Sequence, residues 1–237
     1  MADDSLPRRR FLLRASTAVA AGLTPAVPLA QTKPAAPASG TASSEPESFL
    51  VLTSGEAAFF SAVADSMIPA DELSPSGTDC GVVTFIDRQL ASAWGGGAKM
   101  YRGGPFRKAR PEYGYQLSLT PKEFFSAGIV AANAWTRKTM GKDFDALPPQ
   151  DRINALKALE DGRAQLTGIS GKQLFEALLD IVMEGFFADP MYGGNKDKAG
   201  WKMIGFPGVM ANNAENVKRF NEGQRFTGDP TSIADMS

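Results

Sequence analysis

The chain has 237 residues, of which 43% are hydrophobic and 22% charged, and its net charge is −1. Such a composition is ordinary for a globular domain, and a charge this close to zero excludes the basic footprint of a nucleic-acid-binding protein. The sequence contains no histidine and a single cysteine, Cys80. Histidine-dependent triads, zinc sites, iron–sulfur clusters and covalent haem attachment are therefore excluded.

The N-terminus carries the pattern of a twin-arginine signal peptide. Arg8 and Arg9 are followed by one further residue and then by Phe11 and Leu12. The small, moderately apolar stretch that follows is too short for a comfortable membrane span of about 20 residues. We therefore interpret residues 1–30 as a signal that exports a protein already folded, with an ordinary secretory signal or an uncleaved anchor as the alternatives.

The rest of the chain is expected to be a linker and one all-α domain. Residues 31–48 are rich in Pro, Ala and Ser and predict a disordered linker, so the domain is placed at residues 49–237. Three capping-box patterns, at Thr53, Thr120 and Ser170, each predict a helix start. Apolar residues at helical spacing predict helices over about 53–68, 81–94, 120–139, 148–162 and 170–187, and the last is apolar nearly all round. A helix of that kind is usually buried at the centre of its domain.

Two long segments, 95–119 and 188–209, are dense in Gly, Pro and aromatic residues. Irregular segments of this length are uncommon in compact domains and tend to be functional. Glycines among aromatic side chains suit a surface that a partner approaches closely. We therefore expect these segments to contribute to a protein interface.

Several candidate sites are rejected on spacing. Gly95–Gly97 do not fit a dinucleotide-binding fingerprint, because Met100 stands at the third glycine position and a helix precedes the run. The oxygen ligands Asp189, Asn195 and Asp197 do not have the spacing of a calcium-binding loop, so capping and turn roles are favoured. The basic residues of the first segment alternate with aromatic residues in a pattern that can hold single-stranded nucleic acid, but in a near-neutral exported chain we interpret them as part of a protein-facing loop: Arg102, Arg107, Lys108 and Arg110 with Tyr101, Phe106 and Tyr113. No catalytic, cofactor-binding or metal-binding residue is predicted.

The sequence resembles the small subunit (subunit 3, or gamma) of gluconate 2-dehydrogenase over about residues 49–209. The resemblance is carried by "FFSAVADSMIPADELSPSGTDCGVVTFIDRQLASAWGGG", "GYQLSLTPKEFFSAGI" and above all "EGFFADPMYGGNKDKAGWKMIGFPG". It implies a periplasmic dehydrogenase complex associated with the inner membrane. In such a complex an FAD-binding large subunit of the glucose–methanol–choline oxidoreductase type oxidises the substrate, and a multihaem cytochrome c subunit accepts the electrons.

The resemblance further implies that this chain has no cofactor or catalytic site, and that it supports the folded export and the stability of the flavoprotein. FAD and haem c are expected in the partner subunits, and no nucleic acid is expected. The residues expected at the partner interface all lie in the second irregular segment or directly before it: Phe187, Asp189, Pro190, Tyr192, Gly193, Gly194, Asn195, Trp201, Phe206 and Pro207.

Three alternatives stay open at this stage. The chain could be an oxidoreductase in its own right with Glu184 or Asp189 as its base, or a stand-alone periplasmic sugar-binding protein that stacks Trp94, Tyr101 or Trp201 on a sugar ring. Cys80 is expected to be a buried small hydrophobe or, alternatively, a contact to another subunit.

Overall fold

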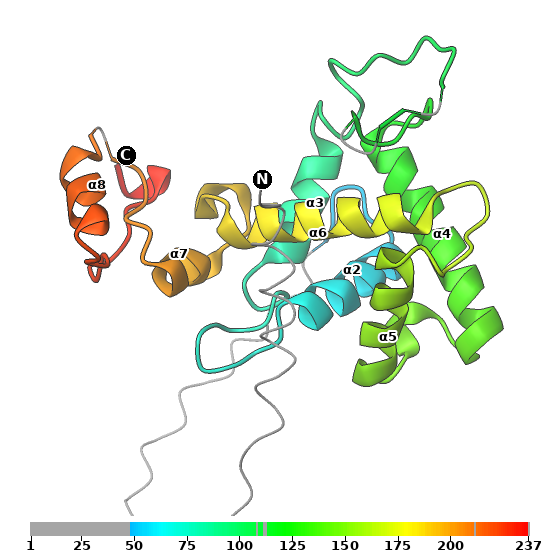
Figure 1. Cartoon of the computed structure of the whole chain (residues 1–237), viewed down its shortest axis with the longest axis horizontal. Coiled ribbons are helices and arrows are strands. Elements are labelled where there is room, and N and C mark those ends of the chain that lie inside the picture. The colour runs from blue at the N-terminus through cyan, green and yellow to red at the C-terminus, as the bar shows by residue number, and fades with distance from the viewer. Residues whose placement is uncertain (1–47, 108, 111–112, 211, 237) are drawn as a thin grey trace, which may run out of the picture. The chain divides into compact units, whose positions relative to one another are not determined.

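The computed structural model describes residues 48–107, 109–110, 113–210 and 212–236 (Figure 1). The predicted signal residues Arg8, Arg9, Phe11 and Leu12, most of the predicted linker and Lys108 lie outside these residues. The all-α prediction is confirmed for the described part of the chain, where no strand occurs and the only β-type pairing is an isolated bridge between Gly208 and Thr231. The α-helices are α2 (Ser54–Met67), α3 (Val82–Ala91), α4 (Pro121–Met140), α5 (Pro149–Glu160), α6 (Gly171–Phe187), α7 (Ala199–Ile204) and α8 (Ala214–Asn221).

Helix starts follow the local chemistry of the sequence. Thr53 and Thr120 each accept a hydrogen bond from the backbone N–H three residues later, and the glutamate at that position accepts one in return, so both capping boxes are confirmed. At the start of α6 only half of the predicted box forms. The Ser170 hydroxyl accepts from the Gln173 N–H, while the Gln173 side chain donates to the Gly114 carbonyl oxygen in the 95–119 segment.

Helix α6 is the centre of the domain, as its apolar sequence predicts. It packs against α2, α3, α4, α5 and α7. Leu174, Leu178 and Val182, spaced one turn apart, are fully buried on one face, while the opposite face carries Asp180 and Glu184. The helix therefore has an apolar inner face and an acidic outer face.

An aromatic cluster joins α2 to α4 and to the short helix η2 (Phe144–Ala146). Phe59 lies 5.0 Å from Phe144 and Phe60 lies 5.7 Å from Phe125, measured between ring centroids. Each buried phenylalanine contributes roughly 2–3 kcal/mol through the apolar area it removes from water. This cluster fixes the helices on which α6 rests.

The buried carboxylate of Asp87 in α3 holds the segment that enters the domain. Its two oxygens accept hydrogen bonds from the backbone N–H groups of Leu50, Val51 and Leu52 at 2.7, 3.0 and 3.0 Å. Three donors on one buried carboxylate satisfy a charge that would otherwise be costly to desolvate. The start of the described chain is thereby attached to α3.

The second irregular segment, 188–209, contains more helix than its sequence indicates: η3 (Pro190–Tyr192), η4 (Lys196–Lys198) and α7. Beyond it, the described residues 210 and 212–236 form an arm with α8 and η5 (Ile233–Met236), and Figure 1 shows α7 leading from α6 to this arm on the side away from α4 and α5. Every helical residue of α8 stays outside the core. Within the described residues, no helix has both the length and the apolar character that a bilayer crossing requires.

Candidate partner-binding surface

The segment after α6 is built around Asn195, whose side chain is fully buried. Its Nδ2 donates to the Ala188 carbonyl oxygen and its Oδ1 accepts from the Gly200 N–H, both at 2.8 Å. Trp201 Nε1 donates to the Phe187 carbonyl oxygen at 2.8 Å. The carbonyl oxygens of Phe187 and Ala188, where α6 ends, thereby gain hydrogen-bond donors, and the Gly200 N–H at the start of α7 gains an acceptor.

The same segment has an unusual backbone. Asn195, Asp197 and Lys198 all have positive φ, at 47°, 56° and 57°. A non-glycine residue in the left-handed region costs about 1–2 kcal/mol, and asparagine and aspartate tolerate it best. The buried hydrogen bonds of Asn195 offset part of this cost and hold the backbone in place.

Close backbone contacts attach this segment to α6 and α3. A Cβ at Gly194 would overlap the carbonyl oxygen of Gly185, and a Cβ at Gly81 would overlap that of Gly193, so only glycine fits at either position. The Lys196 N–H donates to the Cys80 carbonyl oxygen at 2.9 Å. The glycines that the sequence places here therefore serve close packing inside the domain.

Cys80 is 1% exposed, as expected for a small buried hydrophobe. Its sulfur lies 3.6 Å from the Pro75 carbonyl oxygen. Burial, together with the charges of Asp79, Asp197 and Asp65, raises the pKa of the thiol to about 11. The alternative role of Cys80 as a contact to another subunit stays a prediction.

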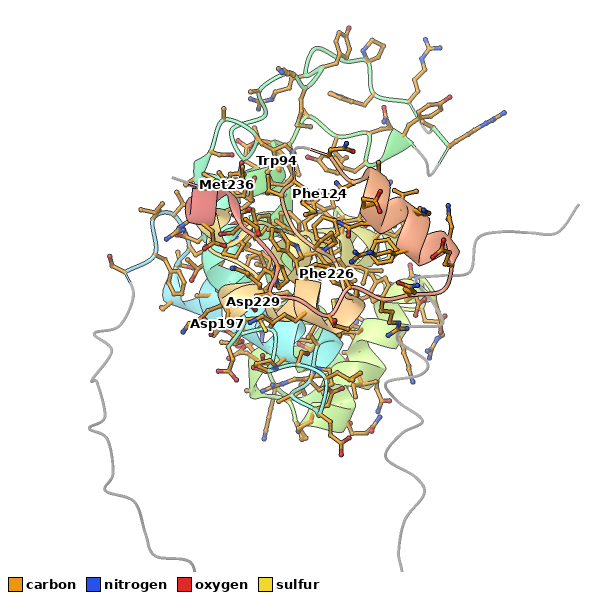
Figure 2. The ribbon with its side chains drawn as sticks, turned by 90° about the vertical axis from the view of Figure 1, so that its left-hand side faces the viewer. Trp94, Phe124, Asp197, Phe226, Asp229 and Met236 are labelled. Atoms are coloured by element: carbon orange, nitrogen blue, oxygen red, sulfur yellow. The ribbon has the colours of Figure 1, made fainter. Side chains whose placement is uncertain are left out.

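Asp189 and Lys198 attach the C-terminal arm to the segment that follows α6. Asp189 accepts from the Met191 N–H at 3.0 Å and from the Ile233 N–H at 2.8 Å. Lys198 Nζ donates to the Pro230 carbonyl oxygen and lies 2.6 Å from Asp235, and its hydrogen bond lowers the pKa of Asp235 to about 2. Figure 2 views the molecule from the side on which this arm lies and labels Asp197, Phe226, Asp229 and Met236 there.

The ten residues predicted at the interface separate into three groups by burial. Asp189, Gly194, Asn195, Trp201 and Pro207 are buried; Phe187, Pro190 and Gly193 are half-buried; only Tyr192 and Phe206 are exposed. The buried members give the segment its shape, and the exposed ones are available to a partner. Their role at an interface stays a prediction.

Sequence reasoning missed several exposed apolar side chains around this segment: Met191, Ile204, Met210, Val217, Phe220, Ile233 and Met236. Single exposed apolar residues are common on any protein surface, so no signal in the sequence separates these from the rest.

A hollow of about 420 Å³ opens beside the segment, between α3 and α6, and is lined by Phe85, Gln89, Glu184, Phe187, Ala188, Asp189 and Tyr192. Glu184 remains exposed to solvent, but the partial burial of its carboxylate raises its pKa, and the negative charge of Asp180 adds to the effect. Both carboxylate oxygens of Asp189 accept backbone N–H groups, so this residue supports a turn. The two residues considered as a catalytic base, Glu184 and Asp189, both line the hollow. Of these two, only Glu184 has a carboxylate that accepts no hydrogen bond from a described residue.

The aromatic residues considered for sugar stacking lie in different environments. Trp201 is 5% exposed and packs edge-on against Phe206, so its ring face is closed to a ligand. Trp94 (labelled in Figure 2) and Tyr101 expose their rings. Across the described residues, no group of three or more acidic or cysteine side chains is arranged to hold a metal ion.

A comparison with protein-family models assigns most of the folded domain to a family. The model described as gluconate 2-dehydrogenase subunit 3 matches residues 54–208, well over half of the chain. The chain belongs to the gluconate 2-dehydrogenase subunit 3 family. Neither a search of the curated proteins nor a search of the solved structures found a match.

Membership of the gluconate 2-dehydrogenase subunit 3 family suggests a small subunit of that dehydrogenase complex. The match begins at the first residue of α2 and ends at Gly208, where the isolated bridge to Thr231 forms. It therefore covers the helical core and the segment organised by Asn195. The arm beyond Gly208, with α8 and η5, lies outside the match.

Proposed function

We propose that this gluconate 2-dehydrogenase subunit 3 family member is the non-catalytic small subunit of a periplasmic, membrane-associated FAD-dependent dehydrogenase for a sugar or gluconate. The family match over residues 54–208 carries this proposal. The partners are an FAD-binding large subunit of the glucose–methanol–choline oxidoreductase type and a multihaem cytochrome c subunit. FAD and haem c reside in those partners, and the complex attaches this chain to the inner membrane.

The same chain escorts the flavoprotein through the twin-arginine route. The leader pattern of Arg8, Arg9, Phe11 and Leu12 supports this role, since that route accepts folded cargo and an escort must bind its partner before export. A domain that presents ordered surface segments around a rigid core is suited to bind an already folded flavoprotein.

Replacing Arg8 and Arg9 with lysine tests the escort role. The flavoprotein is expected to remain in the cytoplasm together with this chain, and flavin-dependent sugar oxidation in the periplasmic fraction is expected to fall to background. A matched control replaces Arg137 and Arg163, both exposed in the described domain, with lysine. Normal periplasmic flavoprotein in the Arg8/Arg9 variant would contradict the escort role.

A direct assay separates this proposal from an enzyme that acts alone. The purified chain is expected to be colourless and to leave gluconate and glucose unoxidised in the presence of an artificial electron acceptor. Addition of the flavoprotein is expected to start oxidation of the substrate. Oxidation by the isolated chain, abolished by Glu184→Gln, would favour the enzyme alternative.

A further inference from the structure

The hollow beside Glu184 combines an apolar lining with several polar groups that have no partner among the described residues. Phe85 and Phe187 form its apolar lining, and Tyr192 stands at its edge with 46% of its surface exposed. No described residue makes a hydrogen bond or ion pair with the Glu184 carboxylate, the Gln89 amide or the Tyr192 hydroxyl. Polar groups that converge on an apolar hollow are typical of a binding site.

The charge around the hollow is negative. Asp180, one helical turn before Glu184, adds a second negative charge near the Glu184 carboxylate. The residues that line the hollow include no lysine or arginine. Arg88, next to Gln89 on α3, instead lies over Gly193, where a Cβ would be 2.9 Å from its Nη1. Bringing a cation to Glu184 would relieve the cost of partly burying this carboxylate beside a like charge.

The lining matches a guanidinium group best. A guanidinium can stack on the aromatic faces of Phe187 and Tyr192 while donating to the Glu184 carboxylate and the Gln89 amide oxygen. The hollow is open to solvent, so it suits a side chain that protrudes from a folded partner better than a sugar, which needs enclosure on most sides.

Apolar residues surround this polar centre. Met191 is exposed beside Tyr192, and the exposed Ile233 is held at the same place by the hydrogen bond from its N–H to Asp189, which lines the hollow. In protein interfaces a few central residues contribute most of the binding energy, and the residues around them exclude water. Met191 and Ile233 are suited to exclude water from the contact at Glu184 and Tyr192.

We propose that this hollow is the site at which the flavoprotein partner inserts an arginine side chain, which pairs with Glu184 and stacks on Tyr192. This inference rests on the proposed function, because it names the surface through which the small subunit binds its flavoprotein.

The test measures the affinity of the full chain for the purified FAD-containing subunit by biolayer interferometry. Glu184→Gln is expected to weaken binding about tenfold and Glu184→Arg about a hundredfold or more, since the partner's cation then loses its ion pair or meets a like charge. Tyr192→Ala is expected to weaken binding about tenfold. Glu176→Gln, two turns earlier on the same helix and outside this hollow, is the matched control and should stay within about twofold of the unmodified chain.

The outcomes separate the two proposals. If the unmodified chain does not bind the flavoprotein, the proposed function fails. If it binds, and the Glu184 variants keep both their melting temperature and full affinity, the hollow is not the site. Glu184→Gln alters neither size nor helix propensity much, so it stays informative even if Glu184→Arg does not fold.

A photo-crosslinking residue in place of Tyr192 identifies the occupant. A crosslink to a flavoprotein peptide that contains arginine is expected. A crosslink back to the arginines at positions 8–14 of this chain, or to a peptide without arginine, would overturn the inference. Saturable quenching of protein fluorescence by gluconate or glucose that Glu184→Gln abolishes would also overturn it, by making the hollow a sugar site.

Discussion

Replacing Asn195 with alanine is the sharpest test of how the segment after α6 is held. The substitution removes the donor to the Ala188 carbonyl oxygen and the acceptor of the Gly200 N–H; the Gly200 bond is buried and the Ala188 bond is partly buried. Leaving a buried polar group without its partner costs about 1–3 kcal/mol, and alanine is also less tolerant than asparagine of a φ of 47°. We therefore expect Asn195→Ala to lower the free energy of unfolding by about 3–5 kcal/mol, a large part of the stability of a typical domain.

Urea unfolding of the full chain, followed by circular dichroism at 222 nm, measures this loss. The control is Asn154→Ala, at an exposed position of α5, which should change stability by less than about 0.5 kcal/mol. A loss below about 1 kcal/mol for Asn195→Ala would refute the assignment of Asn195 as the organising residue.

Asn195→Asp adds a pH signature. An ionised aspartate still accepts from the Gly200 N–H but turns a second oxygen toward the Ala188 carbonyl oxygen, which repels it. Burial favours the protonated acid, which can donate to that oxygen, so the folded-state pKa is raised and the stability deficit shrinks as pH falls. The difference from the unmodified chain should narrow between pH 7 and pH 5, and a difference independent of pH would contradict this geometry.

Three further predictions concern other parts of the domain. Asp87→Ala removes the acceptor of three backbone N–H groups where the chain enters the domain, so the free energy of unfolding should fall by about 3–5 kcal/mol and hydrogen exchange at those amides should accelerate; unchanged exchange there would contradict this role of the carboxylate. With a pKa of about 11, the Cys80 thiol is about one part in a thousand ionised at pH 8, so it should react with a thiol reagent only after unfolding, and fast labelling of the folded chain would contradict its burial. Gly194→Ala should destabilise by more than about 3 kcal/mol because its Cβ meets the Gly185 carbonyl oxygen, whereas Gly55→Ala, in open space inside α2, should stabilise by about 0.5 kcal/mol; equal melting temperatures for the two would contradict the packing.

The helical framework could be predicted from the sequence because its signals are local. Thr53 and Thr120 each lie three residues from the glutamate that completes the capping box. The apolar run of α6 indicates its central position, since a helix with so few polar residues needs neighbours on several sides.

Other features depend on contacts with backbone groups that only the folded domain brings together, and these could not be predicted. Asp87 binds N–H groups 35–37 residues away. An aspartate between apolar residues of a helix is a weak signal of such a role. The glycines and aromatic residues around Asn195 and Trp201 predict a partner interface, with no indication that these two side chains are buried. The fold buries both, since their hydrogen-bond partners are the backbone groups where α6 ends and α7 begins.

Native mass spectrometry of the complex isolated through a tag on this chain tests the division of roles most directly. We expect one copy of this 25.2 kDa chain, or of its processed form, bound to one FAD-containing flavoprotein. On dissociation, the flavin should leave with the large subunit and none with this chain. Flavin bound to this chain, or the chain recovered without a flavoprotein, would contradict its role as a non-catalytic small subunit.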